Sequence, residues 1–280
     1  MTQRNRGDLC PGVLRPWPAA DGMLVRLRLI GGRVSSASLL ALLEVAEHFG
    51  DGRVHLTSRA NLQVRALPGA RGELDAAVLT AIESTGLLPT RTHELVRNVM
   101  VSPQTGLAGG RVDLRPVAVD LDTRLCAAPE LTGLPGRFLI VLDDGRGDLV
   151  SRSCDLGLVA LDAESVQLRV GDEMGPVVSI GCAAEHLTQL AREFAVRRGA
   201  APSAPWHVVE MTDPLVGSAL PDPRLPEPTS PLPFGQVPGG WHAEVAREGL
   251  DRGTVSALTA AVAHVVITPW HGVLVPEETL

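Results

Sequence analysis

Residues 54–67 read V-H-L-T-S-R-A-N-L-Q-V-R-A-L, and from residue 59 onward polar and apolar side chains alternate. Successive side chains of a β-strand point to opposite faces, so this pattern predicts one strand with a buried face. The opposite face would carry four polar side chains, namely Arg59, Asn61, Gln63 and Arg65. Such a row of hydrogen-bond donors on one strand predicts a rigid, cationic surface that binds a large polyanion.

The composition of the 280-residue chain is typical of soluble globular proteins, with 45% hydrophobic and 20% charged residues. A net charge of −7 argues against a general attraction to nucleic acid, so any anion site must be a local cluster. The sequence contains no apolar run of the roughly 20 residues that a membrane span needs. The first twelve residues lack the apolar core of a secretory signal. We therefore expect a cytoplasmic protein with neither a nucleic-acid nor a membrane partner.

The chain contains no lysine, so all 25 strongly basic residues are arginines, whose planar guanidinium groups suit carboxylates and phosphates. The four cysteines do not form the close pairs that zinc and iron–sulfur sites use; they are Cys10, Cys126, Cys154 and Cys182. The sequence therefore predicts that this chain alone builds no metal site. The D-G-R-G-D turn at 144–148 is a weak phosphate-loop candidate, because it lacks the strand-to-helix setting of such loops.

Hydrophobic periodicity predicts strand–helix–strand patterns at both ends of the chain. Near the N-terminus, a strand over 23–30 precedes a helix ending at Phe49, and a second helix covers about 72–84. Strands and a long helix over 183–198 are predicted in the middle of the chain. Ten prolines fall within residues 200–240, which predicts a linker.

The chain also contains a short internal repeat. The segment I-T-P-W-H-G-V-L-V at 267–275, within a strand predicted over 265–275, aligns with L-T-S-R-A-N-L-Q-V at 56–64. The alignment pairs Thr268 with Thr57, and Trp270 with Arg59. A helix and a strand precede both segments, so we expect a duplicated half-sheet that pairs with its copy and covers both open edges.

Five motifs together resemble the siroheme-type nitrite and sulfite reductase superfamily, and within it the precorrin-3B synthases. They are D-L-C-P-G at 8–12, H-L-T-S-R-A-N-L-Q-V-R at 55–65, V-R-N-V at 96–99, L-P-G-R-F-L-I-V-L-D-D-G-R-G-D at 134–148 and I-T-P-W-H-G-V-L-V-P at 267–276. The resemblance implies an α+β fold with two ferredoxin-like half-domains, residues 1–86 and 241–280. A mixed α/β siroheme-reductase-like domain over 87–199 and the proline-rich linker over 200–240 would lie between them.

The resemblance also implies that Arg59 and Arg97 face a tetrapyrrole and that Arg137 binds one of its carboxylates. Together with the polar residues beside them, the predicted tetrapyrrole-binding set is Arg59, Asn61, Gln63, Arg65, Arg97, Asn98 and Arg137. In the reductases two basic residues serve the active site, and here Arg137 takes the first place and Leu139 the second, which weighs against sulfite reduction. The structural alternatives are a solvated strand arginine for Arg59 and a salt bridge to Glu94 for Arg97. No catalytic residue is assigned.

Three functions stay open. The first is a precorrin-3B synthase-like oxygen-dependent hydroxylation of a corrin precursor in cobalamin biosynthesis, with a precorrin-type tetrapyrrole as the small molecule. The second is a non-catalytic tetrapyrrole-binding protein or partner subunit, and the third is a siroheme nitrite or sulfite reductase. Family members hold a [4Fe–4S] cluster, and in the reductases siroheme, through paired cysteines that this sequence lacks. A truncated enzyme or a separate cysteine-bearing polypeptide would account for this difference.

Overall fold

The computed structural model describes residues 8–277, which form two compact units. The first, called here the duplicated unit, combines residues 11–94 with the chain from 231 onward. The second, the mixed-sheet unit, combines residues 95–230 with the segment that ends at Cys10. The fold class is α+β, as predicted. None of the helices in the described range is long and apolar enough to cross a lipid bilayer.

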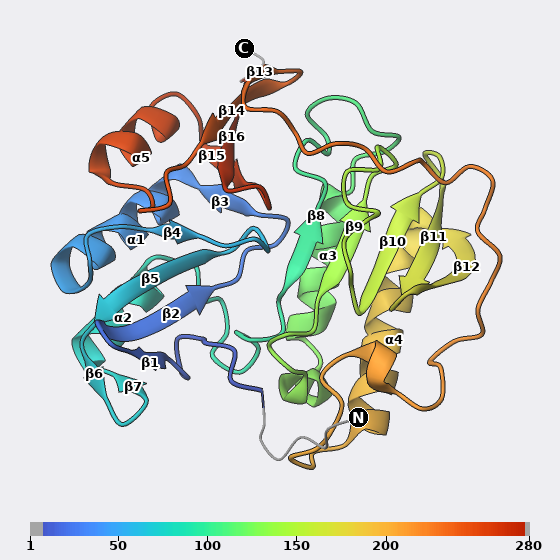
Figure 1. The fold of residues 1–280 in the computed structure, drawn as a ribbon, viewed down its shortest axis with the longest axis horizontal. Coiled ribbons are helices and arrows are strands. Elements are labelled where there is room, and N and C mark those ends of the chain that lie inside the picture. The colour runs from blue at the N-terminus through green and yellow to red at the C-terminus, as the bar shows by residue number, and fades with distance from the viewer. Residues whose placement is uncertain (1–7, 278–280) are drawn as a thin grey trace. The chain divides into compact units, whose positions relative to one another are not determined.

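The duplicated unit contains two sheets with the same internal order, β1-β2-β5-β4 and β13-β14-β16-β15-β3 (Figure 1). Its elements are β1 Trp17–Ala19, β2 Gly22–Leu27, β3 Arg33–Ser35, α1 Ser36–Phe49, β4 His55–Leu56, β5 Leu62–Leu67, β6 Gly69–Ala70, β7 Glu73–Leu74, α2 Ala76–Ser84, β13 Gly235–Val237, β14 Gly240–Glu244, α5 Arg252–Thr259, β15 His264–Ile267 and β16 Gly272–Pro276. Each strand of the first order has a counterpart in the second, which confirms the internal repeat.

The two halves of this unit exchange edge segments. Strand β3 of the first half pairs with β15 of the second. In return, Leu250 of the second half bridges Val54, with backbone N–H···O distances of 3.0 and 2.8 Å in the two directions. Each exchanged segment lies directly before the helix of its own half. The predicted pairing of a half-sheet with its copy is confirmed, and it protects an edge of each sheet.

A single hydrophobic core joins the two halves. Helix α1 begins at Ser35, whose hydroxyl accepts a hydrogen bond from the Ser38 N–H. Its Leu39 is fully buried in a cluster that also contains Val255 of α5 and Ile267 of β15. Since burying a leucine or isoleucine side chain contributes about 1.5–3 kcal/mol, neither half retains its full stabilisation without the other.

The mixed-sheet unit has a five-stranded sheet with the order β12-β11-β10-β9-β8, beside which helices α3 and α4 pack (Figure 1). Its elements are β8 Val99–Val101, α3 Arg115–Cys126, η1 Pro129–Gly133, β9 Ile140–Asp143, β10 Leu156–Ala160, β11 Ser165–Val170, β12 Glu173–Ser179, η2 Ile180–Cys182, α4 Ala183–Arg198 and η3 Val208–Glu210. Strands β8, β9 and β10 are parallel, and β10, β11 and β12 are antiparallel. All residues of β9 and β10 are buried, as is usual for parallel strands.

The prediction of one strand over residues 54–67 is wrong, because a tight turn divides it into β4 and β5. The backbone N–H of Thr57 donates to the Asn61 carbonyl at 3.0 Å, and the Thr57 hydroxyl accepts from the Asn61 N–H at 3.1 Å. Ala60 adopts a left-handed conformation, with φ 56°. Alternation therefore describes a strand only within β5, where Leu62 and Val64 are buried.

The strand predicted over 265–275 is wrong for the same reason, since it consists of β15, a turn and β16. Thr268 N–H donates to the Gly272 carbonyl at 2.9 Å, and His271 takes the left-handed conformation at φ 58°. The two turns therefore have the same length and the same backbone pattern. The sequence alignment that paired Thr57 with Thr268 holds in the structure.

Candidate functional site

The first predicted site residues lie in and after the β4–β5 turn, but they do not form one row. Asn61 is 1% exposed, and its Oδ1 accepts a hydrogen bond from the Leu29 N–H at 2.9 Å. This side chain therefore holds the turn against a neighbouring segment rather than facing solvent. The prediction that Asn61 shares a polar strand face with Arg59 is wrong, because the turn reverses the chain between Arg59 and β5.

Three other polar side chains of this stretch are half-buried. Arg59 lies in the turn itself, while Gln63 and Arg65 lie on the less buried side of β5. Arg65 Nη2 lies 3.2 Å from Asp21 Oδ2, in a partly exposed ion pair. Gln63 Oε1 accepts from Arg26 Nη2 at 3.4 Å. A role of Arg59, Gln63 and Arg65 in ligand binding stays a prediction.

The remaining predicted residues belong to the mixed-sheet unit, where they precede the parallel strands. Arg97 is 9% exposed and binds Asp122 of α3 with two hydrogen bonds, from Nε at 2.6 Å and Nη2 at 2.8 Å. Arg97 therefore forms a salt bridge, as the structural alternative predicted, but its partner is Asp122 and not Glu94. Glu94 accepts instead from the Leu14 N–H at 2.8 Å, and burial raises the pKa of its carboxyl.

Asn98 connects the first residues of β8 and β9. Its side chain is 2% exposed, its Nδ2 donates to the Phe138 carbonyl at 3.2 Å, and its own carbonyl accepts from the Ile140 N–H at 3.0 Å. These contacts align the two parallel strands. Asn98 is therefore placed as a structural residue within its unit.

Arg137 is the most accessible of the predicted residues in this unit, with its side chain half-exposed. Its guanidinium carbon lies 5.2 Å from the ring centroid of Trp206, and its Nε lies 3.5 Å from Asp8 Oδ1. A guanidinium over an indole ring is a favourable cation–π arrangement. The sequence offered no signal for this contact, because Trp206 comes from the proline-rich stretch.

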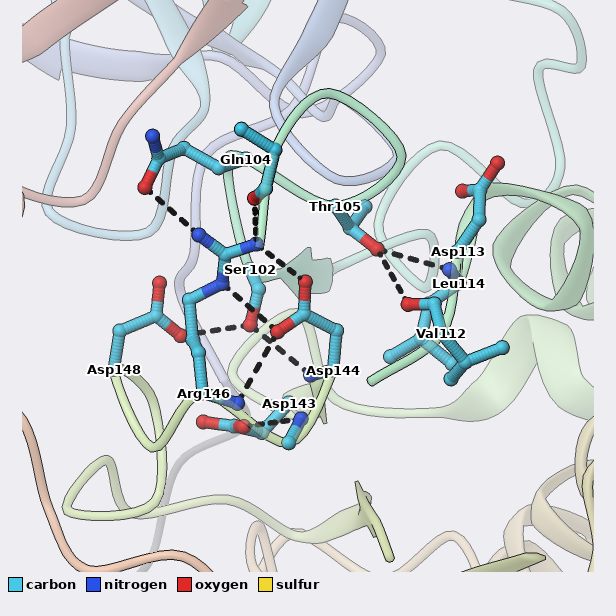
Figure 2. Close-up of polar contacts among 12 residues, drawn as sticks. Ser102, Gln104, Thr105, Val112, Asp113, Leu114, Asp143, Asp144, Arg146 and Asp148 are labelled. Atoms are coloured by element: carbon cyan, nitrogen blue, oxygen red, sulfur yellow. Dashed lines mark hydrogen bonds and ion pairs between the residues drawn. The ribbon is translucent and has the colours of Figure 1, made fainter. Parts of the chain in front are cut away.

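A buried polar cluster lies beyond the carboxyl ends of β8 and β9, at the ends opposite to those that Asn98 connects (Figure 2). The cluster comprises Ser102 after β8 and the loop D-D-G-R-G-D. The sequence did not predict that these residues lie together. Asp144, fully buried, accepts from Arg146 Nε at 2.8 Å and Nη2 at 2.7 Å. Arg146 Nη1 also donates to Gln104 at 2.8 Å. Because Asp144 of the same loop binds the Arg146 guanidinium, this geometry does not support the interpretation of 144–148 as a phosphate-binding loop.

Two further carboxyls complete the cluster. Asp143 accepts three backbone N–H groups of the loop, at 2.8–3.0 Å, and so fixes its shape. Asp148 accepts from the Ser102 hydroxyl at 2.7 Å. Burial, together with the nearby charge of Asp143, raises the pKa of Asp148 to about 7. The loop therefore holds one carboxyl that changes charge near neutral pH.

The cysteines do not meet in the structure as a ligand set. Among residues 8–277, no group of three or more histidine, cysteine, aspartate or glutamate side chains is arranged to hold a metal ion. Burial raises the pKa of the Cys154 thiol to about 11, which opposes the thiolate that iron or zinc requires. The described residues do not fit a [4Fe–4S] cluster.

The protein is similar in sequence to known proteins over about half of its length. Residues 18–77 match the family model of the nitrite/sulfite reductase ferredoxin-like half domain. Precorrin-3B synthase of Sinorhizobium sp is 29% identical over 141 residues, covering 50% of this chain and 29% of that protein. Ferredoxin–nitrite reductase of Synechococcus elongatus is 33% identical over 145 residues, covering 48% of this chain and 27% of that protein. The chain thus spans under a third of the length of these relatives.

The fold also has a solved counterpart. The structure of the Mycobacterium tuberculosis NirA protein matches with a TM-score of 0.70 and 17% identity, covering 91% of this chain and 54% of that chain. At this identity the match shows the fold alone. The matched half domain at 18–77 includes the turn that carries Arg59.

Proposed function

We propose that this chain binds a carboxylate-bearing tetrapyrrole as part of a precorrin-3B synthase-like oxidoreductase, because residues 18–77 match the nitrite/sulfite reductase ferredoxin-like half domain. The observation that carries the proposal is the hydrogen-bonded turn at 57–61, which holds Arg59 within the matched half domain. The similarity to the Sinorhizobium precorrin-3B synthase supports the choice of substrate class.

The chemistry of the predicted residues suits this ligand. Precorrin-type rings carry several acetate and propionate groups, and a guanidinium binds a carboxylate through two parallel hydrogen bonds. The chain has a net charge of −7, so attraction to a polyanion depends on local arginines. Arg59 and Arg65 in the duplicated unit, and Arg137 in the mixed-sheet unit, are the arginines that we assign to carboxylate binding.

The oxidative step is assigned to no described residue. An oxygen-dependent hydroxylation of a corrin precursor would draw its redox chemistry from iron, and the described residues do not fit the iron–sulfur cluster of the family. Ligands would then come from a separate cysteine-bearing polypeptide or from protein outside this sequence. The role proposed for this chain is to bind and orient the tetrapyrrole.

A second candidate is a siroheme nitrite or sulfite reductase, which the similarity to ferredoxin–nitrite reductases favours. Against it, Leu139 is a buried apolar residue at the place where the reductases carry their second basic residue. The third candidate, a non-catalytic tetrapyrrole-binding subunit, shares the binding role and differs only in lacking turnover. Anaerobic purification, iron analysis, an absorption spectrum and a turnover assay separate the three. A Soret band that stays with the protein in gel filtration after siroheme addition supports the reductase, and tetrapyrrole binding without turnover supports the non-catalytic subunit.

The binding role is tested by titrating the purified protein with uroporphyrin III and following porphyrin fluorescence. We expect Arg59→Ala to weaken binding about tenfold, the loss of one good charge-assisted contact, while the melting temperature hardly changes. Arg247→Ala is the matched control, an exposed arginine between β14 and α5 of the same unit. A wild-type protein that binds neither uroporphyrin III nor siroheme would contradict the proposal. A large fall in the melting temperature would show that Arg59 is structural.

A further inference from the structure

Asp155 organises the amino ends of two parallel strands in the mixed-sheet unit. Its side chain is 2% exposed and lies directly before β10. Oδ2 accepts from the Leu139 N–H at 2.8 Å, and Oδ1 accepts from the Val208 N–H at 2.9 Å. One buried carboxylate therefore fixes both the segment that carries Arg137 and the segment that carries His207.

The same carboxylate orients the His207 ring. Nδ1 of His207 lies 3.2 Å from Asp155 Oδ1 and 3.3 Å from Oδ2. Since a carboxylate only accepts hydrogen bonds, Nδ1 is the nitrogen that carries the proton and donates it. The ring is about one-third exposed, and Nε2 makes no hydrogen bond to the part of the chain that the structure describes. Nε2 is therefore the ring nitrogen left for an external partner.

Trp206 holds the Arg137 guanidinium beside the segment that carries His207. It directly precedes His207, and its ring lies under the Arg137 guanidinium at 5.2 Å. This contact restricts the guanidinium, so less side-chain entropy is lost when an anion binds. Asp8 Oδ1 lies 3.5 Å from Arg137 Nε, and the Asp8 side chain is 6% exposed while that of Arg137 is 50% exposed. Because a guanidinium has five N–H donors and half of the Arg137 side chain is exposed, an incoming carboxylate can bind it beside Asp8.

We propose that Arg137 and His207 form a binding subsite for one peripheral carboxylate of the ligand, with Asp155 as the positioning residue. The subsite rests on the proposed tetrapyrrole-binding function and adds residues to it. Arg137 supplies the guanidinium fork, and His207 supplies a fixed nitrogen that donates when the imidazole is protonated. Trp206 supports the guanidinium from below and offers an apolar surface to the ring of the ligand.

The test is a uroporphyrin III titration of the full chain carrying Arg137→Ala or His207→Ala. Each change should weaken binding about tenfold. His186→Ala is the matched control, because His186 is an exposed histidine on α4 of the same unit and has no part in the subsite. In a double-mutant cycle, Asp155→Asn should weaken binding in the wild-type background and weaken it less when His207 is already alanine, because only its contact with the Arg137 segment then remains to be lost.

The outcomes separate the subsite from the proposed function. If the wild-type protein binds and Arg59→Ala weakens binding, while His207→Ala and Arg137→Ala bind as tightly as His186→Ala, the subsite is refuted and the function stands. Absence of binding by the wild-type protein refutes both. Additive effects of Asp155→Asn and His207→Ala would refute the positioning of His207 by Asp155. Because Asp155→Asn could disturb folding, His207→Gln provides a second test: it keeps a donor for Asp155, and its loss of binding should resemble that of His207→Ala.

Discussion

Buried polar side chains in this protein are held by specific partners, and these partners decide what each residue can do. Arg97 forms a two-bond pair with Asp122, and Asn61 accepts the Leu29 N–H. Arg137 is half-exposed over Trp206. Residue type alone does not separate these cases, because an arginine in a salt bridge and an arginine facing a ligand have the same side chain. The difference comes from neighbours that are distant in sequence.

Arg97→Ala tests the structural assignment of this pair. Removing one partner of a buried ion pair leaves the other charge without compensation and typically costs about 3–5 kcal/mol. Because Asp122 is about one-quarter exposed, we expect a loss near the lower end of that range. Urea denaturation measures it. Arg124→Ala removes an exposed pair with Asp120 on the same helix and should cost under about 0.5 kcal/mol. Equal losses in the two variants would contradict the assignment.

Asp148 predicts a pH dependence of stability. Its pKa is about 7 in the folded protein, because burial disfavours the charged form and Asp143 repels it, whereas its ordinary value is 3.8. Between these pH values the folded protein binds more protons than the unfolded chain, so the free energy of unfolding falls as pH rises through this window. Each unit of pKa difference corresponds to about 1.4 kcal/mol.

Denaturation at pH 5, 6, 7 and 8 measures this dependence. Asp148→Asn can still accept the Ser102 hydrogen bond but does not titrate, so its stability should decline less between pH 5 and 7 than that of the wild-type protein. Parallel pH profiles for the two proteins would show that Asp148 ionises normally.

At the scale of elements, the two turns at 57–61 and 268–272 have the same backbone pattern but differ in how deeply they are buried. Both use a threonine hydroxyl to accept a backbone N–H across the turn, at 3.1 and 3.2 Å. Only Thr268 is fully buried, and only its hydroxyl also bonds Nε2 of the buried His242, at 3.0 Å. Burial lowers the pKa of His242, which favours the neutral ring. The second turn therefore depends on its threonine more than the first does.

Because the two turns are duplicates, Thr57 is a matched control for the contribution of Thr268 to stability. Thr57→Val removes one turn hydrogen bond and should cost about 1 kcal/mol. Thr268→Val removes the same bond and also leaves a buried imidazole nitrogen without a partner, which adds about 1–3 kcal/mol. Thermal or urea denaturation of the two variants compares them directly. If Thr57→Val were equally or more destabilising, the buried His242 contact would contribute nothing to stability.

On the scale of the whole molecule, the duplicated unit is built from two chain segments that residues 95–230 separate. Strand β3 pairs with β15, Leu250 bridges Val54, and one core contains residues of both halves. Such interdependence is expected when each half is a small strand–helix–strand unit that cannot bury its own sheet and helices. We therefore expect the unit to fold only after both of its segments have been made.

A protein truncated after residue 230 tests this interdependence. It keeps the 95–230 segment of the mixed-sheet unit but loses β13 to β16 and α5. We expect amide hydrogens of α1 and β5 to lose their protection against exchange, while those of β9 and β10 stay protected. Hydrogen exchange followed by mass spectrometry measures both regions. Retained protection in α1 would show that the first half folds alone.

Several features could be predicted from the sequence because local patterns determine them. The helix over 183–198, the internal repeat and the α+β class follow from hydrophobic periodicity, motif spacing and family resemblance. The turn at 57–61 was missed because polar and apolar residues alternate on both sides of it, so the pattern resembles one continuous strand. The left-handed conformation falls on Ala60 and His271, which carry no glycine signal for a turn.

The sequence by itself determined the long helix over 183–198 and the internal repeat, because side-chain polarity and spacing act over a few residues. Only the tertiary structure decided which polar residues are internal, since Asp122, Leu29 and Asp155 lie 25, 32 and 52 residues from Arg97, Asn61 and His207, respectively. A hydrogen bond depends on distances of about 3 Å between atoms. Spacing along the chain carries no information about such distances until the sheets and helices have packed.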